Sequence, residues 1–218
     1  MHEAKVGPGR VWPSARALAA SGGLLVAGGL ACEISSRVIG AWFSDAPVVP
    51  DLLFVFVPYV REVLWVSTGA MVLGVLLFAY YSLRYARDEL PTYLAILGLM
   101  YLLRAVLIVL TPLAHARGEG PIQMFPLFQN GMWPSGHTAA ALLFAWMTDA
   151  RRAPGLRTVQ VVLAVVVIVA LIVSRGHYSI DIVGGALLAY FVEREWRLGK
   201  LFGPVKRLVY GEIAGAAD

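Results

Sequence analysis

The sequence predicts an all-α fold, a polytopic membrane protein whose six transmembrane helices form one bundle. Of the 218 residues, 59% are hydrophobic and only 15% are charged, and the mean hydropathy is +0.71. A soluble globular domain carries about 25% charged residues, so this composition excludes one. A membrane-spanning helix needs about 20 apolar residues, and the chain is long enough for six such helices with short connections.

The chain is expected to have three parts. These are a cytoplasmic N-terminal segment at residues 1–14, a six-helix membrane domain at residues 15–195 and a cytoplasmic C-terminal tail at residues 196–218. The apolar stretch after residue 14 ends without a cleavage-like site, so it is predicted to remain as the first membrane helix.

Six apolar segments are the predicted spans: 18–34, 63–83, 92–113, 135–148, 158–173 and 179–192. The first is rich in glycine and alanine, which let helices approach closely in lipid. A proline-broken loop at 45–51 follows it, and Pro91 is positioned to start the third span. The glycine- and proline-rich stretch 114–134 is an expected loop, whose aromatic part, 124–133, is either a lid or an interfacial belt.

Lysine and arginine are distributed unevenly along the chain. Thirteen of the 18 lie in the N-terminal region, the 84–91 loop, the 150–157 loop and the C-terminal region from Arg194 onward. The positive-inside rule therefore predicts cytoplasmic termini, with the loops before the fourth and sixth spans facing periplasm, exterior or lumen. The net charge of +4 is spread between apolar segments, so we expect contacts with anionic lipid and no nucleic-acid partner.

The fourth span opens with the sequence WPSGHT at residues 133–138. Ser135 is a good helix N-cap, and Gly136 lets the backbone approach a ligand closely. Free amides at a helix N-terminus bind phosphate readily. We therefore predict that Ser135 and Gly136 bind phosphate, beside His137 at the mouth of the span.

The sixth span opens with the sequence SRGHYSIDIVGG at residues 174–185. His177 and Asp181 are four residues apart, so on a helix they share a face and the carboxylate can accept the imidazole Nδ1 proton. That pairing fixes the tautomer of a nucleophilic or basic histidine and stabilises the imidazolium. Asp181 would be costly in an apolar helix without such a partner.

These residues predict a phosphoester active site in which His137 is the general acid for the leaving alcohol and no metal or other cofactor is needed. The alternative, that the histidines are interfacial residues, is disfavoured because both lie on one predicted side beside a helix start. Arg104 and Arg175 are candidate phosphate ligands, although Arg104 can instead pair within the bundle or snorkel. Glu33 and Arg37, four apart, are predicted to form a structural ion pair.

At these residues the chain resembles the type 2 phosphatidic acid phosphatase superfamily, whose members share a PSGH segment and a later histidine and aspartate four apart. Here these are residues 134–137 and 177–181. The resemblance is greatest to the sphingomyelin synthase-like branch, in which the motifs read SGHT and HY(S/T)xD. That branch also has a proline-aspartate segment after the first span, matched by Pro50 and Asp51, and an arginine in the third span, matched by Arg104.

The resemblance implies a metal-independent lipid phosphotransferase with six spans and an exoplasmic site. His177 would attack phosphorus to form a phosphohistidine, Asp181 would orient it, and His137 would protonate the departing alcohol. The substrate would be a sphingo- or glycerophospholipid, and the acceptor a lipid alcohol such as ceramide or diacylglycerol.

Two alternatives stay open. Hydrolysis of phosphatidic acid to diacylglycerol, as by a lipid phosphate phosphatase, is favoured by the absence of an acidic residue just before SGHT. A transporter subunit or lipid-binding scaffold is the non-enzymatic alternative, but the two halves of the sequence show no internal repeat of the kind that transporters often have.

Overall fold

The computed structural model describes residues 12–116 and 130–211, which form helices and no strand. The elements are α1 (Ala15–Trp42), α2 (Leu53–Phe56), α3 (Val63–Tyr85), the 3-10 helix η1 (Arg87–Glu89), α4 (Leu90–Leu110), α5 (Gly136–Met147), α6 (Pro154–Val173), α7 (Ser179–Leu198) and α8 (Gly203–Tyr210). The all-α prediction is confirmed for these residues.

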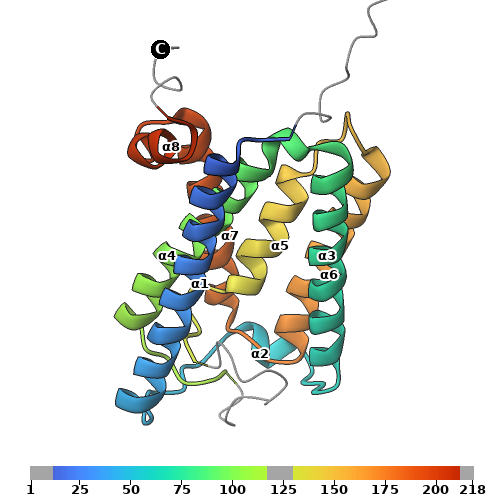
Figure 1. Ribbon diagram of the computed structural model, residues 1–218. Helices are drawn as coiled ribbons and strands as arrows, with labels where there is room; N and C mark the ends of the chain where they lie inside the picture. The colour runs from blue at the N-terminus through green and yellow to red at the C-terminus, as the bar shows by residue number, and fades with distance from the viewer. Residues whose placement is uncertain (1–11, 117–129, 212–218) are drawn as a thin grey trace, which may run out of the picture.

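The six longer helices run up and down in one bundle with α5 at its centre (Figure 1). Helix α1 packs along α4, α3 packs along α6, and α5 contacts α3, α4, α6 and α7. The short helix α2 lies at one end of the bundle, and α8 lies at the other end, against α1. Helix α5 begins inside the bundle rather than at its end, so the first histidine motif is recessed.

Four segments are long and apolar enough to cross a membrane, namely α1, α3, residues 87–110 and α6. Their outward-facing side chains include many exposed valines, leucines and isoleucines, as a lipid-facing surface requires. Helix α5 has 12 residues and is therefore about 18 Å long, short of the roughly 30 Å hydrocarbon core. Helix α7 ends in a charged stretch from Glu193 to Arg197. A membrane protein is supported, and the predicted count of six spans is not confirmed.

Glycines allow α1 and α4 to pack closely, as the glycine-rich first span predicts. A Cβ atom on Gly28 would lie 2.5 Å from the carbonyl oxygen of Gly98. One on Gly98 would lie 2.8 Å from the carbonyl oxygen of Leu24. Both distances are far below van der Waals contact, so the two backbones can meet only where side chains are absent.

Helix α5 is held from several sides by buried contacts. The Phe78 ring of α3 packs against Phe144 of α5 and Tyr93 of α4, with ring centroids 4.9 and 5.2 Å apart. Between α6 and α3, the buried Gln160 side chain donates a 2.9 Å hydrogen bond from Nε2 to the Gly74 carbonyl oxygen. A hydrogen bond of this kind joins helices in an apolar environment, where the donor and the acceptor have no water to bind instead.

Helix boundaries differ from the predicted ones where local signals outweigh hydropathy. Helix α6 begins at Pro154, because a proline suits the first helical turn even before the apolar run starts. Helix α7 continues to Leu198 and ends at Gly199, whose φ of 78° only glycine adopts readily. Part of the predicted C-terminal tail is thus helical, in α7 and α8.

Other predictions fall partly outside the described residues. These are the N-terminal segment up to residue 11, the lid or belt at 124–129, and the tail beyond residue 211. The predicted Glu33–Arg37 ion pair is confirmed, with Arg37 Nε 2.7 Å from Glu33 Oε1 on the surface of α1.

Candidate active site

The first motif forms the N-terminal end of α5, as predicted. The Ser135 hydroxyl accepts a 3.2 Å hydrogen bond from the Thr138 N–H, which confirms Ser135 as the N-cap. The amides of Gly136 and His137 have no acceptor within the part of the chain that the structure describes. The His137 side chain is exposed. This helix end therefore presents two free N–H donors beside an imidazole.

The second motif joins a histidine to a fully buried carboxylate. His177 Nδ1 lies 3.1 Å from Asp181 Oδ2, and the Tyr178 N–H donates to the same oxygen at 2.9 Å. The predicted pair is confirmed, but not as two residues of one helix face. Helix α7 begins at Ser179, so Asp181 lies in its first turn and reaches back over the helix start. His177 itself is only 7% exposed.

The two motifs, forty residues apart in sequence, meet through backbone contacts. The Ser135 N–H donates a 3.0 Å hydrogen bond to the Asp181 carbonyl oxygen. A Cβ on Gly185 would lie 2.5 Å from the Ser135 carbonyl oxygen, so a side chain there would push the motifs apart. The outcome is that the His137 and His177 ring centroids are 6.0 Å apart.

Arg104 holds the loop that precedes the first motif. Its buried guanidinium donates from Nε to the Pro134 carbonyl oxygen at 3.0 Å and from Nη2 to the Gly131 carbonyl oxygen at 2.8 Å. Its Nη1 lies 3.4 Å from the sulfur of Cys32 on α1. A Cβ on Gly136 would lie 2.9 Å from Arg104 Nε. Gly136 therefore makes room for this arginine, a reason that the sequence did not indicate.

Arg175, the other arginine predicted to bind phosphate, follows the end of α6 with a φ of 47°. Its Nη2 donates a 3.2 Å hydrogen bond to the Phe54 carbonyl oxygen in α2. Its guanidinium carbon also lies 5.0 Å from the Phe54 ring centroid and 5.4 Å from that of Tyr59. These contacts attach α2 to the segment that leads into His177.

Asp51 helps to position the second motif and was not among the predicted site residues. Its carboxylate accepts hydrogen bonds from the N–H and, at 3.0 Å, the hydroxyl of Ser179, at the start of α7. The same carboxylate accepts the Leu53 N–H at 2.9 Å. The partners Asp51 and Ser179 are 128 residues apart, so local spacing carries no signal of the contact. Only the proline-aspartate segment of the resembled family pointed to it.

The arrangement is suited to group transfer onto an imidazole. With Nδ1–H held by Asp181, the lone pair on Nε2 of His177 is free to act as a nucleophile. The second imidazole, that of His137, lies 6.0 Å away between ring centroids, in the first turn of α5. Among residues 12–116 and 130–211, no group of three or more histidine, cysteine, aspartate or glutamate residues is placed to hold a metal ion.

Comparison with protein families agrees with the site. Residues 132–196 match the family model described as PAP2 superfamily C-terminal, a stretch that contains both histidine motifs. The match supports the PAP2 superfamily, whose members are phosphatases, and so supports a phosphatase or phosphoesterase type of function. It does not distinguish the sphingomyelin synthase-like branch from lipid phosphate phosphatases. No curated protein matches the chain.

Replacing Asp51 by alanine is expected to loosen the start of α7, because the Ser179 N–H loses its acceptor. Loss of a helix cap typically costs about 1 kcal/mol of stability. Hydrogen exchange should therefore accelerate at the amides of residues 178–182, with a lower melting temperature. Asp45→Ala is the control, because the Asp45 carboxylate lies in the same loop and accepts only from Ser44 among the described residues. Equal exchange in both variants would contradict the capping role.

Proposed function

We propose that this protein is an integral membrane enzyme that cleaves a lipid phosphoester through a phosphohistidine at His177. The observation that carries the proposal is the His177–Asp181 pair, joined at 3.1 Å, with the His137 ring 6.0 Å from the His177 ring between centroids. A nucleophilic imidazole needs a fixed tautomer, and a poor alcohol leaving group needs an acid. The two histidines supply these two functions.

In the first half of the reaction, Nε2 of His177 attacks the phosphorus atom. The P–N bond forms as the P–O bond to the lipid alcohol breaks, and protonated His137 gives its proton to the departing oxygen. Asp181 holds Nδ1–H throughout and stabilises the positive charge that develops on the ring. Burial of the carboxylate strengthens that interaction, because little water competes for it.

In the second half, neutral His137 takes a proton from the acceptor alcohol, whose oxygen attacks the phosphorus. The new P–O bond forms, the P–N bond breaks, and the electron pair returns to Nε2. We favour a lipid alcohol such as ceramide or diacylglycerol as the acceptor, with the headgroup carried on the phosphate. The burial of His177 supports this choice, because exclusion of water protects a phosphohistidine from hydrolysis. Hydrolysis is the second candidate, supported by the exposure of His137.

The transferred phosphate would bind at the N-terminal end of α5. The free amides of Gly136 and His137 are oriented donors at the positive end of a helix dipole. Ser135 fixes this helix end by capping it. Arg104 would add positive charge behind Gly136, and Arg175 would contribute from the α6–α7 connection. Three guanidinium donors of Arg104 already have acceptors, so its role would be electrostatic and positional.

The bundle would cross the membrane six times, with α5 and α7 as the two shorter or more polar crossings. The positive-inside rule then gives cytoplasmic termini and a site open to the opposite side. Helix α5 begins part of the way into the bundle, and not at its end. The phosphoester must therefore reach histidines that lie inside the bundle, which supports lateral entry of a lipid from the membrane.

The roles of the two histidines can be separated by the leaving group. His177→Ala is expected to abolish turnover of every ester, because no P–N bond can form. His137→Ala should slow cleavage of a natural lipid by about 100- to 10,000-fold, but much less for a p-nitrophenyl ester, whose alcohol leaves without a proton. Steady-state kcat/KM measurements on both substrates test this expectation.

Arg37→Gln is the control for these kinetics, because it removes only a surface ion pair of α1 and should retain wild-type rates. An equal loss on both esters in His137→Ala would rule out His137 as the acid. Melting temperatures of all variants should be recorded, so that unfolding is not mistaken for lost catalysis.

The acceptor can be identified from the products in liposomes. We expect purified protein in EDTA, given phosphatidylcholine, phosphatidylethanolamine or phosphatidic acid, to form a substituted phosphate on ceramide or diacylglycerol, detected by mass spectrometry. Phosphocholine or phosphoethanolamine released into water, or free phosphate from phosphatidic acid, with no new phospholipid, would mean hydrolysis. The absence of product from any lipid, in wild type as in His177→Ala, would favour the scaffold alternative.

A further inference from the structure

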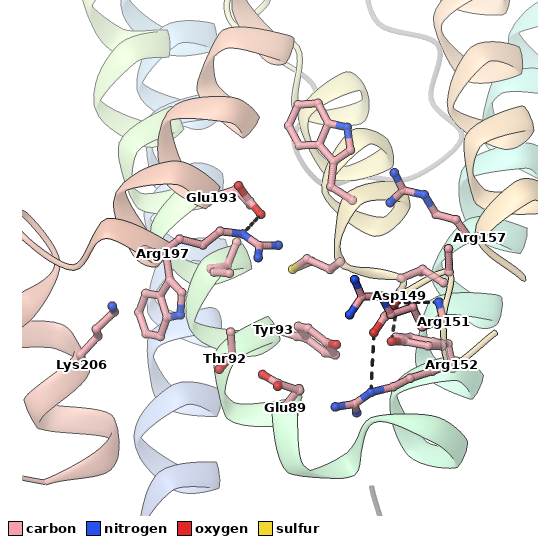
Figure 2. Close-up of a pocket in the computed structure, with 17 residues that line it drawn as sticks. Glu89, Thr92, Tyr93, Asp149, Arg151, Arg152, Arg157, Glu193, Arg197 and Lys206 are labelled. Atoms are coloured by element: carbon pink, nitrogen blue, oxygen red, sulfur yellow. Dashed lines mark hydrogen bonds and ion pairs between the residues drawn. The ribbon is translucent and has the colours of Figure 1, made fainter. Parts of the chain in front are cut away.

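A polar cavity lies at the end of the bundle opposite α2, where α5 and α7 end and α4 begins. It has a volume of about 640 Å³, within the range of roughly 300–1,000 Å³ that small-molecule sites occupy. Figure 2 shows charged side chains around an open centre, from η1, the turn after α5, α6, α7 and α8. His137 is in the first turn of α5 and Met147 ends it, so about 15 Å of helix separates this cavity from the histidines.

The side chains that line the cavity carry excess positive charge. Five are cationic and three are carboxylates. Arg152 lies 3.2 Å from Asp88 and 3.9 Å from Asp149, and Arg197 pairs with Glu193. Three further cations have no carboxylate partner among the described residues: Arg151, Arg157 and Lys206. They line the cavity together with Glu89, a carboxylate that has no ion-pair partner among residues 12–116 and 130–211.

These three cations come from separate elements that the fold brings together. Arg151 lies in the turn after α5, Arg157 in the first turn of α6, and Lys206 on α8. The Lys206 ammonium lies 5.6 Å from the ring centroid of Trp196, which also lines the cavity. Arg157 and Lys206 are each partly buried. Partial burial makes unpaired charge unfavourable, so an anion beside these cations would be stabilised.

We propose that this cavity is a binding site for a phosphate group, separate from the histidine site. Guanidinium groups offer pairs of N–H donors that match phosphate oxygens, and an ammonium adds a point charge. The flanking tryptophans Trp146 and Trp196 suit the membrane interface. The phosphate can be that of an anionic lipid headgroup or of a soluble phosphomonoester, and both share the chemistry that the cavity recognises.

The experiment measures binding to full-length His177→Ala protein, in which turnover at the histidine site is absent. One arm titrates radiolabelled inorganic phosphate and glycerol phosphate in detergent. The other arm measures retention of phosphatidic acid over phosphatidylcholine by native mass spectrometry. The double variant Arg157→Gln with Lys206→Gln is expected to weaken binding about tenfold or more, because it removes two charged hydrogen-bond donors.

Arg207→Gln is the matched control, because Arg207 neighbours Lys206 on α8 but does not line the cavity. It should leave the affinity unchanged. The site is supported if either arm shows binding that falls in the double variant only, and the arm that responds identifies a lipid headgroup or a soluble phosphate as the source. Absent binding in both arms, or equal affinity in the double variant and the control, overturns the proposal. If the double variant does not fold, the same binding measurements on Arg151→Gln test the proposal, and weaker binding than in the control is expected.

Discussion

One backbone hydrogen bond, from the Ser135 N–H to the Asp181 carbonyl oxygen, joins the two halves of the histidine site. It links the cap of α5 to the first turn of α7, and in a low-dielectric interior such a bond is strong. It can form only because Gly185 leaves no side chain between α7 and the Ser135 carbonyl oxygen. The 6.0 Å spacing of the two imidazole rings is a consequence of this contact.

Two charged side chains near that hydrogen bond, Arg104 and Asp51, each hold one of the two motifs in place. Arg104, buried in α4, uses three of its donors to fix the loop before Ser135 and to reach Cys32 on α1. Asp51, from the loop before α2, caps α7 from outside the bundle. The position of both histidines is thus set by backbone and charged contacts from α4 and the α2 region, as well as by packing of apolar side chains. A site held in this way is preorganised, as the proposed attack by His177 requires.

The features that the sequence predicted are those with local signals. Hydropathy indicated the six longer helices, Ser135 is a cap with a local partner, and His177 and Asp181 are close in the chain. The contacts that it missed are long-range: Asp51 with Ser179, and Arg104 with the loop before the first motif. The sequence also carried no sign that Gly136 leaves room for Arg104, because a side chain that packs across a helix interface has no local signal in the sequence.

The central position of α5 and the polar cavity were not predicted from the sequence, for related physical reasons. The short α5 can be recognised as central only once its neighbours are seen to surround it. In the sequence, the basic residues that line this cavity belong to separate loops, and they were used only to predict the orientation of the chain in the membrane. Folding brings a turn, a helix start and α8 around one cavity, and this gives the same charges a shared binding surface.

The most direct test of the account is to trap the phosphoryl group on the enzyme. Wild-type protein would be mixed with a lipid whose phosphate carries an isotopic label, and the reaction would be quenched in alkali within milliseconds. The protein would then be digested, and the labelled residue would be identified by mass spectrometry. The account predicts an acid-labile, alkali-stable phosphoryl group on His177, formed before product and absent from His177→Ala. Product formation with no label on His177, or with the label on another residue, would contradict it.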